Sequence, residues 1–317
     1  MILTVEKTEL LEGSITAPSS KSHSVRAVLL AGLSKGRSTL HNLLKSDDTE
    51  AVLDIVRGLG ARIEEREDAV LVTGSGLPLK LRADILFSRN SGISTKFTLP
   101  FLGLRADADK TVSLDAGEQM RKRPIMPLIK ALNTLGMEIM PDSLECPFPL
   151  SVSGILRGGI AEVDGESSQY VSALLLALPL AAKDSLIRVK NLQERPYVDM
   201  TLSWLDRLGI SYQHARSEDW DTYTISGRQA YRPFEITIPA DFSSASYIIA
   251  AAALVPGEIL IRGLDMNDPQ SDKRLIEILR NMGADISEEL QGLSIRGGRN
   301  LQGMMIDAND IPDMLPT

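Results

Sequence analysis

One short segment recurs four times along this chain, first as AVLDIVRGLGARI at residues 51–63. The other copies are PLIKALNTLGMEI (127–139), MTLSWLDRLGISY (200–212) and RLIEILRNMGADI (274–286). Each copy has apolar residues at helical spacing, then a glycine where a helix would end, then strand-like residues. The glycines are spaced by 76, 73 and 74 residues: Gly60, Gly136, Gly209 and Gly283. This near-constant interval predicts a repeated structural module.

A second element precedes each copy and reads as an apolar helix, a polar or glycine turn, and a strand. These elements lie at 24–43, 96–116, 170–192 and 244–264. The module is therefore strand, helix, strand, helix and further strand, which indicates a mixed α/β fold. Three of the helical stretches are apolar on nearly every side, so they are expected to be buried: AVLLAGL (27–33), SALLLALPLA (172–181) and SYIIAAAALV (246–255).

Composition narrows the function. A chain of 317 residues is long for one core, so two domains are expected. Its net charge of −8 argues against a general nucleic-acid-binding protein, although a local group of cations could still bind a small anion. A single cysteine, Cys146, forms no internal disulfide, and the three histidines, His23, His41 and His214, lack the spacing of a zinc site.

The apolar runs are too short for a membrane span. The longest, at 170–182 and 247–256, fall below the roughly 20 residues that a spanning helix needs. The first residues, MILTVEKTELLEGSI, carry no basic region followed by a long apolar segment, so no signal peptide is predicted. We therefore expect a soluble, cytoplasmic protein without a membrane partner.

Polar segments stand directly before the predicted helices. They are SSKSHSVR (19–26), SRNSGIST (88–95), DGESSQYV (164–171), ADFSSASY (240–247) and ANDIPDML (308–315). Serine at a helix start is explained by capping alone. Capping does not explain the other charged and amide groups: Lys21, Arg26, Lys96, Asp241, Asp310, Asp313 and Gln169. Two interpretations remain open, ordinary capped helices or a site for a hydroxyl-bearing polyanion held at helix N-termini.

The chain resembles the EPSP synthase (3-phosphoshikimate 1-carboxyvinyltransferase) family along its whole length. The motifs are SSKSHSVRAVLLAGLSKGRSTLHNLLKSDDTEAVLDIVRGLGA (19–61), RNSG (89–92), RKRPIMPLIKALNTLGMEI (121–139), DGESSQYVSALLLALPLA (164–181), RPYVDMTLSWLDRLGI (195–210), DFSSASYIIAAAAL (241–254) and IDANDIPDM (306–314). The resemblance implies an α/β fold of two domains built from βαβαββ units, an inside-out α/β barrel joined by a two-strand hinge. One domain would take residues 1–19 and 239–317 and be incomplete at its C-terminal end, and the other would take 20–238.

The resemblance also implies an activity. Members of this family transfer the enolpyruvyl group of phosphoenolpyruvate to the 5-hydroxyl of shikimate 3-phosphate and release phosphate, in the shikimate pathway of aromatic amino acid biosynthesis. No metal or organic cofactor is implied, and the expected partners are the two small substrates, with the protein a monomer.

The family's functional residues can be carried over to matching positions. Lys21 would touch both substrates and donate a proton, and Asp313 would bind hydroxyls of shikimate 3-phosphate and act as base. The remaining shikimate 3-phosphate ligands would be Ser22, Arg26, Ser167, Ser168 and Gln169. Phosphoenolpyruvate would be bound by Asn90, Gly92 and an arginine of the 117–124 loop, either Arg121 or Arg123, with Arg123 favoured.

Several positions depart from the family pattern. Ile93 replaces a usual threonine and Lys96 a usual arginine, so the phosphoenolpyruvate loop and its response to inhibitors that mimic that substrate are open. Glu194 stands where a phosphate-binding serine is common, and we expect it to turn away from the phosphate or to pair with Arg195.

The match also stops early. Family members have six units, whereas IDANDIPDMLPT (306–317) starts a fifth, so the 317-residue chain alone is expected to bind shikimate 3-phosphate and to be poorly active. One alternative is an incomplete, non-catalytic chain that only binds this ligand. Another is a UDP-N-acetylglucosamine enolpyruvyl transferase, which is disfavoured because the 115–124 loop has no cysteine.

Overall fold

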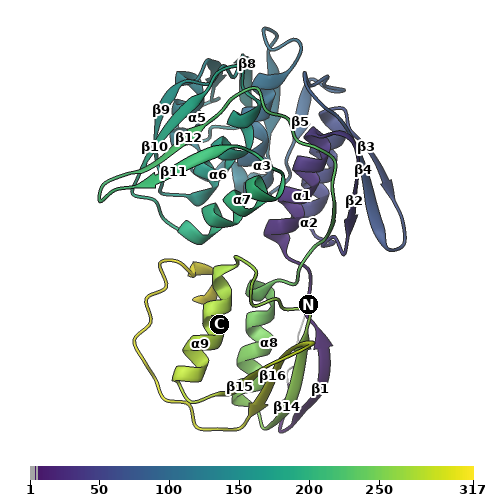
Figure 1. Ribbon diagram of the computed structural model, residues 1–317, viewed down its shortest axis with the longest axis vertical. Coiled ribbons are helices and arrows are strands. Elements are labelled where there is room, and N and C mark those ends of the chain that lie inside the picture. Colours follow the sequence, from purple (N-terminus) through teal and green to yellow (C-terminus); the bar gives the residue numbers. More distant parts are fainter. Residues whose placement is uncertain (1–3, 5) are drawn as a thin grey trace. The chain divides into compact units, whose positions relative to one another are not determined.

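The computed structural model describes residue 4 and residues 6–317, and it divides the chain into two compact units. The larger unit is formed by Lys21–Ile238, and the smaller by the described residues of Met1–Ser20 together with Pro239–Thr317. The chain therefore passes from one unit to the other twice, at 20–21 and at 238–239 (Figure 1).

The larger unit contains three four-stranded sheets. Its helices are α1 (Lys21–Leu33), α2 (Asp47–Gly58), α3 (Gly92–Thr98), η1 (Leu99–Leu104), α4 (Glu118–Arg121), α5 (Met126–Thr134), α6 (Ser168–Ala177), η2 (Leu178–Leu180) and α7 (Arg195–Arg207). Its strands are β2 (Lys35–His41), β3 (Arg62–Glu65), β4 (Ala69–Ser75), β5 (Ile85–Phe87), β6 (Val112–Asp115), β7 (Met137–Met140), β8 (Leu150–Gly154), β9 (Ile160–Asp164), β10 (Ser185–Lys190), β11 (Tyr212–Arg216), β12 (Asp221–Ile225) and β13 (Glu235–Thr237).

The smaller unit contains one four-stranded sheet. Its strands are β1 (Leu11–Thr16), β14 (Gly257–Arg262), β15 (Asp285–Glu289) and β16 (Gly292–Gly297). Its helices are α8 (Phe242–Leu254), η3 (Ser271–Lys273), α9 (Arg274–Asn281) and η4 (Pro312–Met314). Figure 1 shows α8 and α9 lying beside this sheet, with α8 in contact with β14 and β16.

All four sheets share one topology, which confirms the repeated α/β module. The strand orders are β13-β2-β4-β3, β5-β6-β8-β7, β9-β10-β12-β11 and β1-β14-β16-β15. In each order as written, the first two strands are parallel to each other. The third strand runs antiparallel to both of its neighbours, the second and the last strand of the order. In two modules the first strand comes from a segment distant in the sequence: β2 pairs with β13, and β14 pairs with β1.

The repeated glycines end the second helix of each module, as predicted. Gly60, Gly136, Gly209 and Gly283 all have positive φ, and each follows the C-cap residue of α2, α5, α7 or α9. At α2 the Gly60 N–H donates to the Arg57 carbonyl and the Ala61 N–H to the Val56 carbonyl, which is the Schellman pattern. A left-handed residue here reverses the chain into the next strand.

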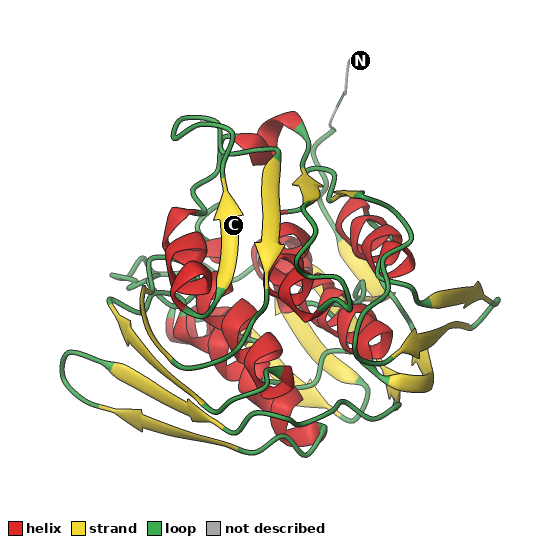
Figure 2. Ribbon diagram, turned by 90° about the horizontal axis from the view of Figure 1, so that it is seen from above, coloured by secondary structure: helices red, strands yellow, loops and turns green. Residues whose placement is uncertain are grey.

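The helices of the larger unit form its core, and its sheets lie around them (Figure 2). Helices α1, α3 and α6 are buried almost throughout, as predicted for the first and third of these segments. The prediction was wrong for α8, because only one side of that helix is covered. Tyr247 and Leu254 of α8 are 57% and 62% exposed, although this helix is more apolar than α1 and α6.

Candidate functional site

The N-terminal ends of α1, α2 and α3 are linked by side-chain contacts in the larger unit. Lys21 opens α1, and its Nζ lies 4.0 Å from Oδ2 of Asp48 in the first turn of α2. The hydroxyl of Ser91, the N-cap of α3, donates to Oδ1 of Asp48. Because helix N-termini carry partial positive charge, Asp48 lies where a carboxylate is stabilised and holds the three helix starts together.

The start of α3 also meets the start of α6 and the loop before α5. A Cβ added to Gly92 would lie 2.9 Å from Nη1 of Arg123 and 3.7 Å from Oε1 of Gln169. Lys96, one turn into α3, donates from Nζ to the same Oε1 of Gln169 at 3.1 Å. Arg123 and the Gln169 amide therefore approach Gly92, where the absent side chain leaves room for them, and Lys96 joins this group through Gln169.

The start of α6 is joined to the start of α7 by Glu194. Ser168 is buried, and its hydroxyl donates to Oε2 of Glu194 at 2.7 Å. The Ser168 backbone N–H points to the same oxygen at 3.4 Å. Glu194 is the N-cap residue of α7 and has a left-handed backbone, with φ of 51°. The Glu194 carboxylate bonds to Ser168 rather than to Arg195, which pairs with Asp221 at 2.6 Å. The expected pairing with Arg195 is therefore wrong, and the expectation that Glu194 turns away from a bound phosphate stays a prediction.

Lys96 is a buried cation in the cluster formed by these helix starts. Its side chain lies 5.3 Å from the centre of the Tyr170 ring and is almost fully buried. Burial lowers the pKa of the Lys96 ammonium to about 8, and the Arg123 guanidinium acts in the same direction. The carboxylates of Glu194 and Glu166 raise that pKa, so the charge of Lys96 depends on the anions around it.

Arg26 is placed differently from the other predicted ligands. It is 2% exposed and donates to the Thr201 hydroxyl at 2.9 and 3.0 Å, to the Tyr197 carbonyl at 3.0 Å and to the Ser22 carbonyl at 3.0 Å. Its guanidinium also lies 5.0 Å from the centre of the Phe97 ring. Burial lowers the pKa of Arg26 to about 9, which leaves it charged at neutral pH. The structure therefore shows Arg26 joining α1 to α7, and its predicted contact with a ligand stays a prediction.

The two arginines proposed for phosphoenolpyruvate differ in their surroundings. Arg121 donates to both carboxylate oxygens of Asp115, at 2.9 and 2.7 Å, and to the Ala116 carbonyl. Arg123 is exposed and approaches Gly92. Asn90 accepts a hydrogen bond from the Gln119 N–H at 3.1 Å and so connects the α3 loop to the loop that carries both arginines.

The remaining predicted residues lie at helix starts. Ser22 is the second residue of α1, and Ser167 is the N-cap of α6, whose hydroxyl accepts from the Gln169 N–H at 3.4 Å. Asp313 belongs to the smaller unit, where it lies exposed in η4. Its role as base stays a prediction.

Two acidic residues of the cluster were not singled out from the sequence. Asp48 and Glu166 occupy helix starts, where acids are common for capping and dipole reasons alone. Their only signal was position: each lies within a few residues of a predicted polar helix start.

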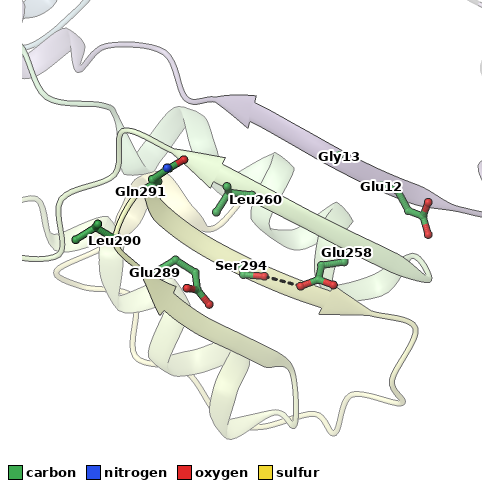
Figure 3. A pocket seen from close by; sticks show the side chains of 8 residues that line it. All are labelled: Glu12, Gly13, Glu258, Leu260, Glu289, Leu290, Gln291 and Ser294. Carbon is green, nitrogen blue, oxygen red and sulfur yellow. Dashed lines mark hydrogen bonds between the residues drawn. The ribbon is translucent and has the colours of Figure 1, made fainter.

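Hollows are also found among the described residues of the smaller unit. One, of about 640 Å³, lies on the sheet and is lined by Glu12, Gly13, Glu258, Leu260, Glu289, Leu290, Gln291 and Ser294 (Figure 3). Ser294 donates to Glu258 at 3.0 Å, and the glutamates make this hollow unsuitable for an anion. Another, of about 310 Å³, is apolar and lies among α8, α9 and residues 301–317.

The described part of the chain has neither a metal-binding cluster nor a membrane-spanning helix. Among residue 4 and residues 6–317, no group of histidine, cysteine, aspartate and glutamate side chains is arranged to hold a metal ion. Within the same residues, every helix is too short or too polar to cross a lipid bilayer.

The repeated module and the cluster of helix starts define an α/β protein with an anion-type site, and its similarity to known proteins identifies the family. The model of the EPSP synthase (3-phosphoshikimate 1-carboxyvinyltransferase) family matches residues 5–317. The chain is 40% identical over 316 residues to the 3-phosphoshikimate 1-carboxyvinyltransferase of Acetivibrio thermocellus, with 100% of this chain and 73% of that protein covered. The enzyme of that name from Ruminiclostridium cellulolyticum is 39% identical with the same coverage. The chain therefore belongs to the EPSP synthase family of shikimate-pathway transferases.

Solved structures agree with the fold. EPSP synthase from Acinetobacter baumannii matches with a TM-score of 0.81 at 24% identity, over 98% of this chain and 71% of that one. A second structure of EPSP synthase from the same organism gives a TM-score of 0.79 over 96% of this chain and 69% of that one. The predicted α/β fold of this family is thus confirmed.

Proposed function

We propose that this chain binds shikimate 3-phosphate and phosphoenolpyruvate and transfers the enolpyruvyl group to the 5-hydroxyl of shikimate 3-phosphate, with release of phosphate. The observation that carries the proposal is the meeting of helix starts around Lys21, Lys96 and Arg123 in the larger unit. Cations beside helix N-termini suit ligands with phosphate and carboxylate groups. Relatives of 40% and 39% identity bear the name of this activity.

We assign the substrates to two sides of the cluster. Shikimate 3-phosphate is held by Lys21 and by groups at the starts of α1 and α6: Ser22, Arg26, Ser167, Ser168 and Gln169. Phosphoenolpyruvate is held by Lys21, Asn90, Gly92 and Arg123. Arg123 is preferred to Arg121 because Asp115 already takes up the guanidinium of Arg121.

The chemistry needs one acid and one base. The 5-hydroxyl oxygen forms a bond to C2 of phosphoenolpyruvate, its proton passes to Asp313, and the methylene carbon receives a proton. Loss of a proton from the resulting methyl group restores the double bond as the bond from C2 to the phosphate oxygen breaks. Lys21 is the proposed proton donor, since its ammonium group is half exposed and can reach a bound ligand.

Two measurements test the proposal. Calorimetry with shikimate 3-phosphate should show binding, and Lys21→Ala should weaken it. A phosphate-release assay with both substrates measures transfer, and replacing shikimate 3-phosphate by UDP-N-acetylglucosamine should abolish the signal. Binding without phosphate release would favour a ligand-binding chain over an enzyme. Absence of shikimate 3-phosphate binding would overturn the proposal.

A further inference from the structure

Glu194 places a carboxylate on the donors that open α6. Its Oε2 accepts the hydrogen bond of the Ser168 hydroxyl at 2.7 Å and lies 3.4 Å from the Ser168 N–H. A serine hydroxyl has one proton to donate, so this donor is already used within the chain. Ser168 is 2% exposed and cannot turn to an alternative partner in water.

The cations near Glu194 are bonded to other groups. Arg195, its neighbour in sequence, is committed to the buried Asp221 at 2.6 Å. Lys96 is the cation that acts on Glu194, and it bonds to Gln169 in the first turn of α6. The carboxylate thus occupies the position that a bound anion would take at this helix start, and it interacts favourably with the Lys96 ammonium.

We propose that Glu194 is a specificity-determining residue that competes with the phosphate group of the ligand for Ser168. The identity of that ligand, shikimate 3-phosphate, rests on the proposed function. Two anions on the same donor repel each other, so the phosphate binds only as the carboxylate leaves. Glu194 is partly exposed and can rotate into water, whereas Ser168 stays buried. The chain therefore binds the phosphorylated ligand less tightly than it would without this carboxylate.

The competition acts on the phosphate alone, and this separates it from a general structural role. Calorimetry should compare shikimate 3-phosphate with unphosphorylated shikimate for the chain, for Glu194→Gln and for Glu194→Ser. Glu194→Ser should bind shikimate 3-phosphate about tenfold more tightly, since it removes both the charge and the group that occupies Ser168. Glu194→Gln should fall between Glu194→Ser and the parent, and the affinity for shikimate should change less than twofold.

Glu166→Gln is the matched control. Glu166 lies two residues before Ser168, is exposed, and acts on Lys96 in the same way as Glu194. Its neutralisation removes the same charge from the same helix start and leaves Ser168 bonded to Glu194. An equal gain of affinity in Glu166→Gln would assign the effect to net charge and overturn the proposal. Unchanged or weaker binding in Glu194→Ser, with the fold intact by circular dichroism, would also overturn it.

Inorganic phosphate provides a second test, which does not depend on the identity of the ligand. A ligand that binds the folded state raises the unfolding midpoint. Sodium phosphate, compared with sodium chloride at equal ionic strength, should raise the midpoint of Glu194→Ser more than that of the parent or of Glu166→Gln. If no variant binds shikimate 3-phosphate but phosphate still shows this order, the proposed function fails and the inference stands. An equal phosphate effect in all three proteins would overturn the inference.

Discussion

Gly92 shows how one missing side chain shapes the candidate site. A Cβ there would lie 2.9 Å from Nη1 of Arg123, closer than side chains normally approach. The nearest atom is the end of a flexible arginine, so the fold can accommodate the change by moving Arg123. We expect Gly92→Ala to weaken phosphoenolpyruvate binding by about tenfold, the scale of one charge-assisted hydrogen bond, with unfolding free energy within about 1 kcal/mol of the parent.

Calorimetry with phosphoenolpyruvate and urea unfolding measure these two effects. Gly303→Ala is the control, because no described residue other than its chain neighbours comes within 4 Å of a Cβ at that position. A loss of affinity in Gly303→Ala as large as in Gly92→Ala would contradict the role given to Arg123.

Lys96 makes anion binding depend on pH. Its pKa of about 8 in the ligand-free chain means that it loses its charge as the pH rises through that value. A bound anion favours the protonated form, so binding takes up a proton and the affinity for phosphoenolpyruvate should fall between pH 7 and 9. Lys96→Arg stays charged over this range, and its affinity should remain nearly constant. Calorimetry at several pH values checks this; equal slopes for both proteins would remove Lys96 as the cause.

Arg26 joins helix α1 to helix α7 through buried hydrogen bonds. Replacing it by alanine removes its buried hydrogen bonds to the Tyr197 and Ser22 carbonyls and to the Thr201 hydroxyl. We expect Arg26→Ala to lower the free energy of unfolding by about 2–4 kcal/mol, whereas Arg37→Ala, at an exposed position of β2, should change it by less than about 0.5 kcal/mol. Urea denaturation measures both. A stable Arg26→Ala that loses shikimate 3-phosphate binding would instead favour the ligand role.

At the scale of elements, the module depends on how its second helix ends. Gly136 and Gly209 occupy the same position after α5 and α7, both with positive φ. A Cβ at Gly136 would lie 2.7 Å from the Ile155 carbonyl oxygen, whereas a Cβ at Gly209 would meet none of the described residues beyond its chain neighbours within 4 Å. Gly209→Ala should therefore cost about 1–2 kcal/mol, the backbone penalty alone.

Gly136→Ala should cost at least about 1 kcal/mol more, because the helix end must also move away from the carbonyl. Chemical denaturation of the two variants gives this difference directly. Equal costs would show that only the backbone conformation matters at these turns.

The two units of the molecule differ in how completely their apolar helices are buried. In the larger unit α1 and α6 are buried on all sides, whereas α8 in the smaller unit leaves Tyr247 and Leu254 exposed. Amide exchange follows local opening, which is easier where fewer apolar contacts must break. We expect the amides of α8 to exchange at least tenfold faster than those of α1 and α6, measured by hydrogen–deuterium exchange. Equal protection would mean that α8 opens only with global unfolding.

Local signals were enough to find the module and the ends of its helices. A helix that ends at a left-handed residue needs glycine at that place, so Gly60, Gly136, Gly209 and Gly283 mark the repeat in the sequence itself. The same holds for the polar helix starts, because caps and dipoles act within one turn. The motifs at those starts also identified the family and the residues, such as Gly92 and Gln169, that the fold brings together.

Long-range pairing and side-chain direction could not be obtained in this way. The partner of β2 is β13, nearly two hundred residues later, and no local pattern selects it. The burial of α8 depends on what packs against it rather than on its composition, since α8 is more apolar than the buried helices α1 and α6. Glu194 turns towards Ser168 because a buried hydroxyl and a helix start attract its carboxylate, and Arg195 is held by Asp221. Each of these outcomes rests on groups distant in sequence, whose free energies of interaction exist only once the chain has folded.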